Sequence, residues 1–193
     1  MIKQMERDIK EKIAMVMRMK KIALAKLIIP FGLVGIIVLF LWFAGPDIYT
    51  KYAKVFVAYF APFSWVPIAT GLKLLHIHPA ALISFITFTD ADLSLFLVWN
   101  LDYAKKIPGL GKLVESTEES GEKAIRKYKW VKRRRFVGLV LFVIIPISWT
   151  GSAVGSIVGR LIGMTPFMTW FAVVLGSSLR SILITALINV LFP

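Results

Sequence analysis

Four charged side chains stand inside long apolar stretches of this 193-residue chain: Asp90, Asp92, Arg160 and Arg180. Because an unpaired charge is expensive to bury in a bilayer, such residues commonly carry ion or substrate pathways. At about 1.5 Å per residue, Asp90 lies about 16 Å beyond Pro79, and Arg180 about 20 Å before the chain end. Both would then lie near the middle of a membrane crossing, where they can meet. An aspartate balanced between burial and a nearby arginine is suited to carry protons; a structural pair that fixes helix packing is the alternative.

The other two charges have more than one interpretation. Asp92 lies about 200° around a helix from Asp90, so at most one of them faces a given partner squarely. Asp92 can instead reach toward the inner interface. Arg160 can extend its side chain to the cytoplasmic interface, as long basic side chains near helix ends do. We therefore treat all four residues as candidates for a proton or substrate pathway.

Two apolar stretches carry the same phrase, Pro62-Phe-Ser-Trp65 and Pro146-Ile-Ser-Trp149, each followed at equal spacing by an Ala and a Gly. After a three-residue slip, Pro79 aligns with Pro166. Repeated apolar segments that proline or glycine interrupts point to the substrate site of a secondary transporter. Near these breaks, hydroxyls and freed backbone groups can bind an ion or an anionic headgroup, or the hydroxyls can simply satisfy that backbone. The predicted hairpin-tip residues are Pro62, Ser64, Pro67, Pro146, Ser148 and Thr150.

Four glycines recur at every fourth position: Gly151, Gly155, Gly159 and Gly163. On a helix this spacing leaves one face without side chains, which favours close approach of a neighbouring membrane helix. A ligand groove on that face is the alternative.

Composition excludes several classes of protein. The chain is 58% hydrophobic and its mean hydropathy is +0.74, so we expect an integral membrane protein rather than a soluble domain. It has no cysteine and therefore no thiolate metal site. His76 and His78 would point to different sides of a helix, so they are not arranged to bind a metal ion together. With no nucleotide-binding loop or nucleophile elbow, the sequence predicts no enzyme, catalytic residue, cofactor or metal site.

The net charge of +13 comes from two basic clusters, one before residue 27 and one between Lys105 and Arg135. The positive-inside rule places both in the cytoplasm, beside anionic lipid headgroups rather than nucleic acid. Three full crossings between the clusters would place the second cluster outside the cell, which that rule forbids. The segment to exclude is 55–75, because its prolines would break a continuous helix.

A re-entrant helical hairpin resolves this conflict, since irregular backbone at membrane depth is tolerated where protein or water covers it. The same interpretation after Arg135 gives a second hairpin, 136–163, that enters from the opposite side. We therefore expect an all-α protein of the cell membrane with several crossings, two inverted repeats and a cytoplasmic N-terminus. The predicted parts are an amphipathic helix (1–22), a transmembrane helix (23–44), repeat 1 (53–98), a basic cytoplasmic loop (99–135) and repeat 2 (136–193).

The second repeat resembles the small multidrug export family. Its phrase runs from Leu139 through Pro146-Ile-Ser-Trp-Thr150-Gly151 to Gly155, after Lys127-Tyr128 and before Leu161-Ile-Gly163. Val66-Pro67-Ile68-Ala69-x-Gly71 stands where the first half of that family has a similar phrase. The resemblance covers about residues 52–193 and implies kinship with the larger DedA-type membrane proteins, which have two re-entrant hairpins from opposite faces.

The chain departs from the family pattern at three places. It has Ala61-Pro62-Phe63-Ser64 where relatives carry Glu-Leu-Arg-Gly, and Ser148 replaces a proline. Where relatives often have an asparagine, Asp90 or Asp92 lies nearby, so we expect an aspartate to replace the usual acid in this chain. We expect a small transporter of amphiphilic or lipid-like molecules, driven by protonation of Asp90 and its separation from Arg180. A lipid translocase without ion coupling and a membrane scaffold are the alternatives, and a homo-oligomer is left open.

Overall fold

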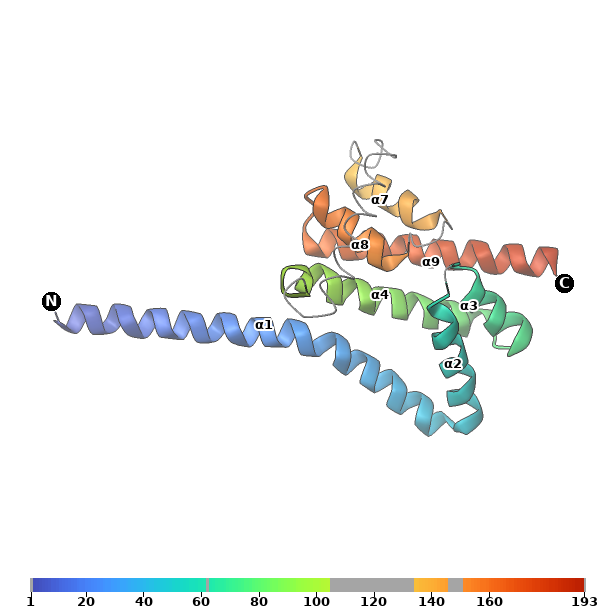
Figure 1. Cartoon of the computed structure of the whole chain (residues 1–193), viewed down its shortest axis with the longest axis horizontal. Coiled ribbons are helices and arrows are strands. Elements are labelled where there is room, and N and C mark those ends of the chain that lie inside the picture. The colour runs from blue at the N-terminus through green and yellow to red at the C-terminus, as the bar shows by residue number, and fades with distance from the viewer. Residues whose placement is uncertain (1, 62, 105–133, 146–150, 193) are drawn as a thin grey trace.

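The computed structural model describes residues 2–61, 63–104, 134–145 and 151–192, and all regular structure in these ranges is helical. Three helical segments are long and apolar enough to cross a membrane: Lys21–Ala44, Pro79–Leu101 and Pro166–Leu191. They coincide with the three crossings that the sequence predicts (Figure 1). Most of the predicted cytoplasmic loop lies outside the described residues.

Helix α1 (Ile2–Ala44) is one continuous helix, so no break separates a helix 1–22 from a helix 23–44. It bends in the region of Pro30 (Figure 1). Proline has no N–H to bond the carbonyl four residues earlier, here that of Lys26. Asn100 of the neighbouring helix α4 (Pro79–Ala104) donates to this carbonyl instead, over 2.9 Å. The bend in α1 is thus supported by a polar contact with α4.

Gly45, at a φ of 118°, ends α1, and Pro46 begins α2 (Pro46–Tyr59). A turn then leads into the short helix α3 (Val66–Ala69) and a π-helical turn, η1 (Thr70–Leu74). Both contact α2, so the segment folds back on itself. At 14 residues, α2 is well below the roughly 20 residues of a full crossing.

In the second half, two short helices precede a long one. Helices α7 (Arg135–Ile144) and α8 (Ser152–Leu161) have ten residues each and pack on each other and on the long helix α9 (Pro166–Leu191). Glycines allow the close approach. A Cβ on Gly155 would lie 2.7 Å from Val143, and one on Gly159 would lie 2.4 Å from Thr169. Gly163 does not continue this face, because it follows the end of α8 with a φ of +78°.

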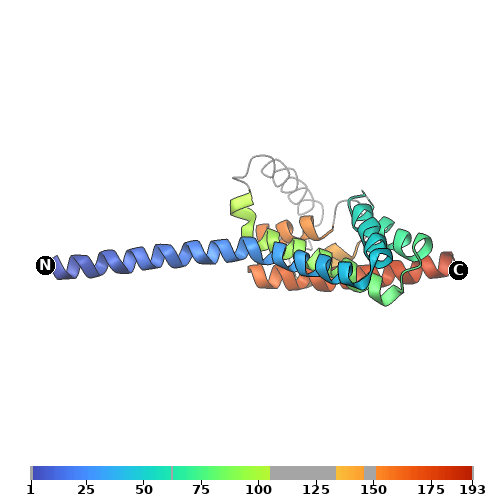
Figure 2. The same ribbon diagram turned by 90° about the horizontal axis from the view of Figure 1, so that it is seen from below.

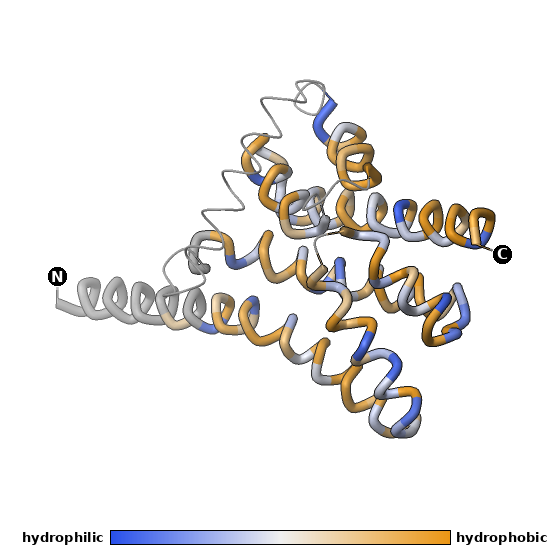
Figure 3. Tube along the Cα trace, turned by 45° about the vertical axis from the view of Figure 1, so that its right-hand side comes forward, coloured by the Kyte–Doolittle hydropathy of each residue, from blue (hydrophilic) through white to orange (hydrophobic). Residues whose placement is uncertain are grey.

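The long helices α4 and α9 lie side by side and antiparallel at the centre of the molecule (Figures 1 and 2). Helix α8 also packs on α4, and α3 on α9, so the short helices of each half contact the long helix of the other half. The segment Lys21–Ala44 of α1 and helix α9 consist mainly of apolar residues (Figure 3), and large side chains are exposed on both, with Phe43 85% exposed and Phe167 70% exposed. Such surfaces are typical of helices that face lipid.

Candidate functional site

The centre of the contact between α4 and α9 holds a buried ion pair. Nη2 of Arg180 lies 2.7 Å from Oδ2 of Asp90, and the two side chains are 4% and 1% exposed. The structure therefore brings together the two charges that helix geometry places near mid-crossing. One charge comes from each half of the chain.

Two hydroxyl groups complete the surroundings of the Asp90 carboxylate. Tyr59 at the end of α2 donates to Oδ1, and Ser177 of α9 donates to Oδ2. The Tyr59 oxygen also lies 3.1 Å from Oγ of Ser152, the first residue of α8. Because the Tyr59 proton goes to Asp90, Ser152 can donate to Tyr59 in turn. The carboxylate thus connects α2, α4, α8 and α9.

Local sequence spacing explains how α9 supplies two of these donors. Ser177 and Arg180 are three residues apart and so share one face of the helix. If the alignment of Pro79 with Pro166 is continued without a gap, Asp90 aligns with Ser177. These two aligned residues are hydrogen-bonded partners.

Three donors offset the cost of burying the Asp90 charge, because charge-assisted hydrogen bonds are the strong ones. Arg180 is less completely satisfied. Its Nη1 is buried and has no hydrogen-bond partner among the described residues. A Cβ placed on Gly151, just before α8, would lie 3.7 Å from this nitrogen. The absence of a side chain at Gly151 leaves room beside the guanidinium.

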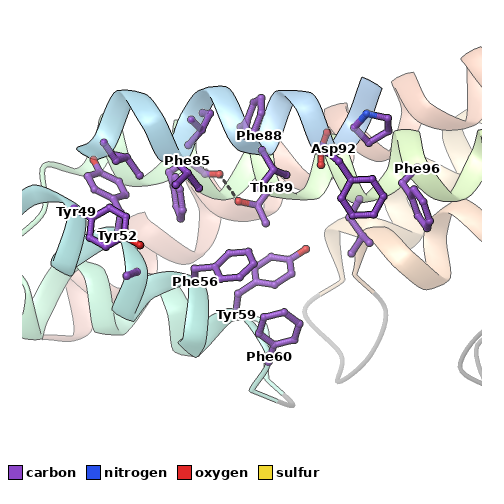
Figure 4. Close-up of a pocket in the computed structure, with 18 residues that line it drawn as sticks. Tyr49, Tyr52, Phe56, Tyr59, Phe60, Phe85, Phe88, Thr89, Asp92 and Phe96 are labelled. Carbon is purple, nitrogen blue, oxygen red and sulfur yellow. Dashed lines mark hydrogen bonds between the residues drawn. The ribbon is translucent and has the colours of Figure 1, made fainter. Parts of the chain in front are cut away.

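Asp92 lies on a different side of α4, away from the ion pair. It lines a cavity of about 540 Å³ between α1, α2 and α4. The aspartate is only 8% exposed, and its Oδ1 has no hydrogen-bond partner in the part of the chain that the structure describes. Figure 4 shows Asp92 at the cavity together with aromatic rings from α2 and α4. The two aspartates therefore have contrasting environments: both oxygens of Asp90 accept hydrogen bonds, whereas Oδ1 of Asp92 has no partner among the described residues.

Tyr59 contacts both the cavity at Asp92 and the buried carboxylate of Asp90. Its ring lines the cavity beside Phe56 and Phe60 (Figure 4), while its hydroxyl donates to Asp90. A movement of the ring would therefore change the hydrogen bonding of the buried carboxylate.

Among the described residues, the predicted site residues Arg160, Ser64 and Pro67 do not join this cluster. Arg160 is only partly exposed and donates from Nη1 to the carbonyl of Met164, 3.1 Å away. Pro67 is buried in the first turn of α3, and the Ser64 hydroxyl is buried without a partner among residues whose positions are described. Four predicted tip residues lie outside the described ranges: Pro62, Pro146, Ser148 and Thr150. Within those ranges, no three His, Asp or Glu side chains are grouped closely enough to hold a metal ion.

Sequence reasoning missed Tyr59, Ser152 and Ser177. A signal existed for Ser177, since it lies one helical turn before the candidate Arg180. Tyr59 immediately precedes the first predicted turn, but nothing in its neighbourhood identifies Asp90 as its partner.

Comparison with known proteins gives one match. Residues 64–183 match the model of a protein family described as "Putative small multi-drug export protein". This range contains both aspartates and both arginines discussed above, and Tyr59 precedes it. A search of curated proteins found no match. A search of solved structures also found none.

Proposed function

This chain belongs to the small multi-drug export protein family, and we propose that it exports small amphiphilic molecules, using a proton that binds to Asp90. The observation that carries the proposal is the buried pair of Asp90 and Arg180, which joins the two halves of the chain. Buried ionisable pairs between membrane helices are typical of proton and substrate pathways.

The proposed architecture is a pair of inverted repeats. In repeat 1, α2 with α3 and η1 forms a re-entrant hairpin and α4 crosses the membrane; in repeat 2, α7 with α8 forms the hairpin and α9 crosses. Three observations support this arrangement. The hairpin helices are too short to span, the aligned residues Asp90 and Ser177 meet between antiparallel helices, and the positive-inside rule places both basic clusters in the cytoplasm. The same arrangement would extend the relationship to the DedA-type proteins.

The mechanism follows from the contacts of the carboxylate. When Asp90 is ionised, Arg180, Tyr59 and Ser177 all donate to it, and the two halves are held together. A proton on Asp90 removes its charge and turns one oxygen into a donor, so the attraction to Arg180 is lost and one hydroxyl partner must reorient. Release of these contacts allows one half to move against the other, so that a site at membrane depth becomes exposed to alternate sides.

Tyr59 provides the coupling between substrate and proton in this scheme. A molecule in the cavity contacts its ring, and the ring position determines whether the hydroxyl reaches Asp90. Binding of substrate and binding of the proton would therefore influence each other, as reciprocal linkage requires.

The test is efflux of rhodamine 6G from proteoliposomes with and without a pH gradient across the membrane. In Asp90→Asn we expect efflux driven by the gradient to be lost. The matched control is Asp47→Asn, which changes an exposed aspartate in the first turn of α2 and should retain that efflux. Flux that responds neither to the gradient nor to Asp90→Asn would refute proton coupling.

A lipid translocase without ion coupling is the second candidate. Nη1 of Arg180, which has no partner in the described part of the chain, favours it, because a buried guanidinium N–H can bind a phosphate oxygen. In this case Asp90→Asn would spare movement of a fluorescent phospholipid between leaflets, whereas Arg180→Gln would abolish it. A scaffold would show no flux of either kind.

A further inference from the structure

The cavity between α1, α2 and α4 is almost entirely apolar and has one acid. Its aromatic lining includes Phe56, Tyr59, Phe60, Phe85, Phe88 and Phe96. None of the residues that line it is Lys, Arg or His, so no side chain of the cavity can neutralise the carboxylate of Asp92. The volume of about 540 Å³ falls within the roughly 300–1,000 Å³ of small-molecule sites.

Asp92 is the unexplained group in this cavity. A buried carboxylate oxygen without a hydrogen bond is costly, and it stays in a folded protein when a ligand or a proton satisfies it. Asp90, two residues earlier, already has its partner in Arg180. Among the residues that the structure describes, nothing pairs with Oδ1 of Asp92, so its charge is free to recruit a ligand.

We infer that the cavity binds organic cations with large apolar bodies, with Asp92 as the counter-ion. The aromatic faces attract a positive charge through their quadrupoles, and the apolar lining removes the hydrophobic body of the ligand from water. Anions of the same size would face both the negative carboxylate and the negative faces of the rings. This inference rests on the proposed export function and specifies the class of molecule exported.

The geometry distinguishes a cation from a lipid tail as the occupant. A neutral acyl chain would fill the apolar part of the cavity but would leave the charge of the Asp92 carboxylate uncompensated. A cation satisfies both parts at once. Access is available because the cavity is not sealed: Phe31 and Val38 of α1, which line it, are 66% and 43% exposed.

The experiment compares two probes of the same shape and opposite charge, tetraphenylphosphonium and tetraphenylborate. Their dissociation constants are measured on the purified full-length chain in one detergent. Because both probes also enter the micelle, each constant for a variant is compared with that of the unmodified chain. In Asp92→Asn, which keeps the side-chain shape, we expect phosphonium binding to weaken at least tenfold, about 1.4 kcal/mol. Borate binding should stay the same or become tighter.

Two controls keep the result interpretable. Asp47→Asn removes an exposed charge elsewhere and should leave both constants unchanged. Phe88→Leu removes an aromatic ring one turn from Asp92, on the same side of α4, and should weaken phosphonium binding severalfold more than borate binding. This second variant supplies the test if Asp92→Asn does not fold. Equal effects of Asp92→Asn on both probes, or none on either, would overturn the inference in favour of a lipid-tail site.

The binding result is separable from the proposed function. Loss of phosphonium binding in Asp92→Asn, together with unchanged gradient-driven efflux in Asp90→Asn, would retain the cation site and refute proton coupling at Asp90. The reverse pair of results would retain the coupling and refute the cation site.

Discussion

The pair of Asp90 and Arg180 allows a quantitative test of how charge is balanced in the core. In Asp90→Asn the arginine keeps its charge at 4% exposure and loses its ionic partner. Removing one member of a buried pair costs about 3–5 kcal/mol, because an uncompensated charge remains buried. For a protein of this size, each kcal/mol lowers the midpoint of thermal unfolding by about 2–4 °C. The expected decrease is therefore roughly 6–20 °C.

The double variant Asp90→Asn/Arg180→Gln removes both charges and leaves two groups that can bond to each other. Replacing a whole buried pair by neutral groups is often close to neutral in stability, so most of the lost midpoint should return. The double variant should still lack gradient-driven efflux, since neither side chain can then carry the charge. The assay is thermal unfolding of the purified chain in detergent, followed by circular dichroism. Additive losses in the double variant would refute the argument that the two charges compensate each other.

Three further variants test individual contacts by the same unfolding assay. Tyr59→Phe removes a hydroxyl donor from Asp90 and should cost about 1–3 kcal/mol; an unchanged midpoint would mean that water replaces the hydroxyl. Asn100→Ala leaves the Lys26 carbonyl without its donor and should cost a similar amount. The cost should be smaller in a Pro30→Ala background, because the alanine would supply the backbone N–H that the proline lacks. Equal costs in both backgrounds would refute this role of Asn100. Gly176→Ala places a Cβ 2.8 Å from Val143 and 2.9 Å from a backbone oxygen, and it should cost about 1–3 kcal/mol. The control Gly32→Ala has open space around it and should be neutral or stabilising. Equal unfolding midpoints in the two variants would contradict the packing at Gly176.

The parts of the fold that the sequence predicts are those that depend on local pattern. The three candidate spans follow from runs of about 20 apolar residues, and the ends of α1 and α2 follow from Gly45 and the Pro62 region. The meeting of Asp90 with Arg180 could be anticipated, because charges at mid-crossing are few and seek each other. The bend in α1 could also be expected from Pro30.

Other features depend on packing between distant segments and leave little trace in the sequence. Hydroxyl residues are frequent in this chain, so nothing marked Tyr59 or Ser152 as part of the Asp90 cluster. The cavity at Asp92 lies between α1, α2 and α4, and no local pattern encodes how these three helices are arranged. The partner of the Lys26 carbonyl, Asn100, is equally remote in sequence.

The central claim is that Asp90 gains and loses a proton while it is buried against Arg180. Infrared difference spectroscopy on acidification measures this directly, because a protonated carboxyl group has its own stretching band. The experiment compares Asp92→Asn with Asp90→Asn/Asp92→Asn, so that the other acids cancel in the difference. We predict a carboxylic acid band in the first variant that is missing from the second, over the pH range in which efflux operates. Identical spectra from the two variants would show that Asp90 does not change its protonation state and would contradict the mechanism.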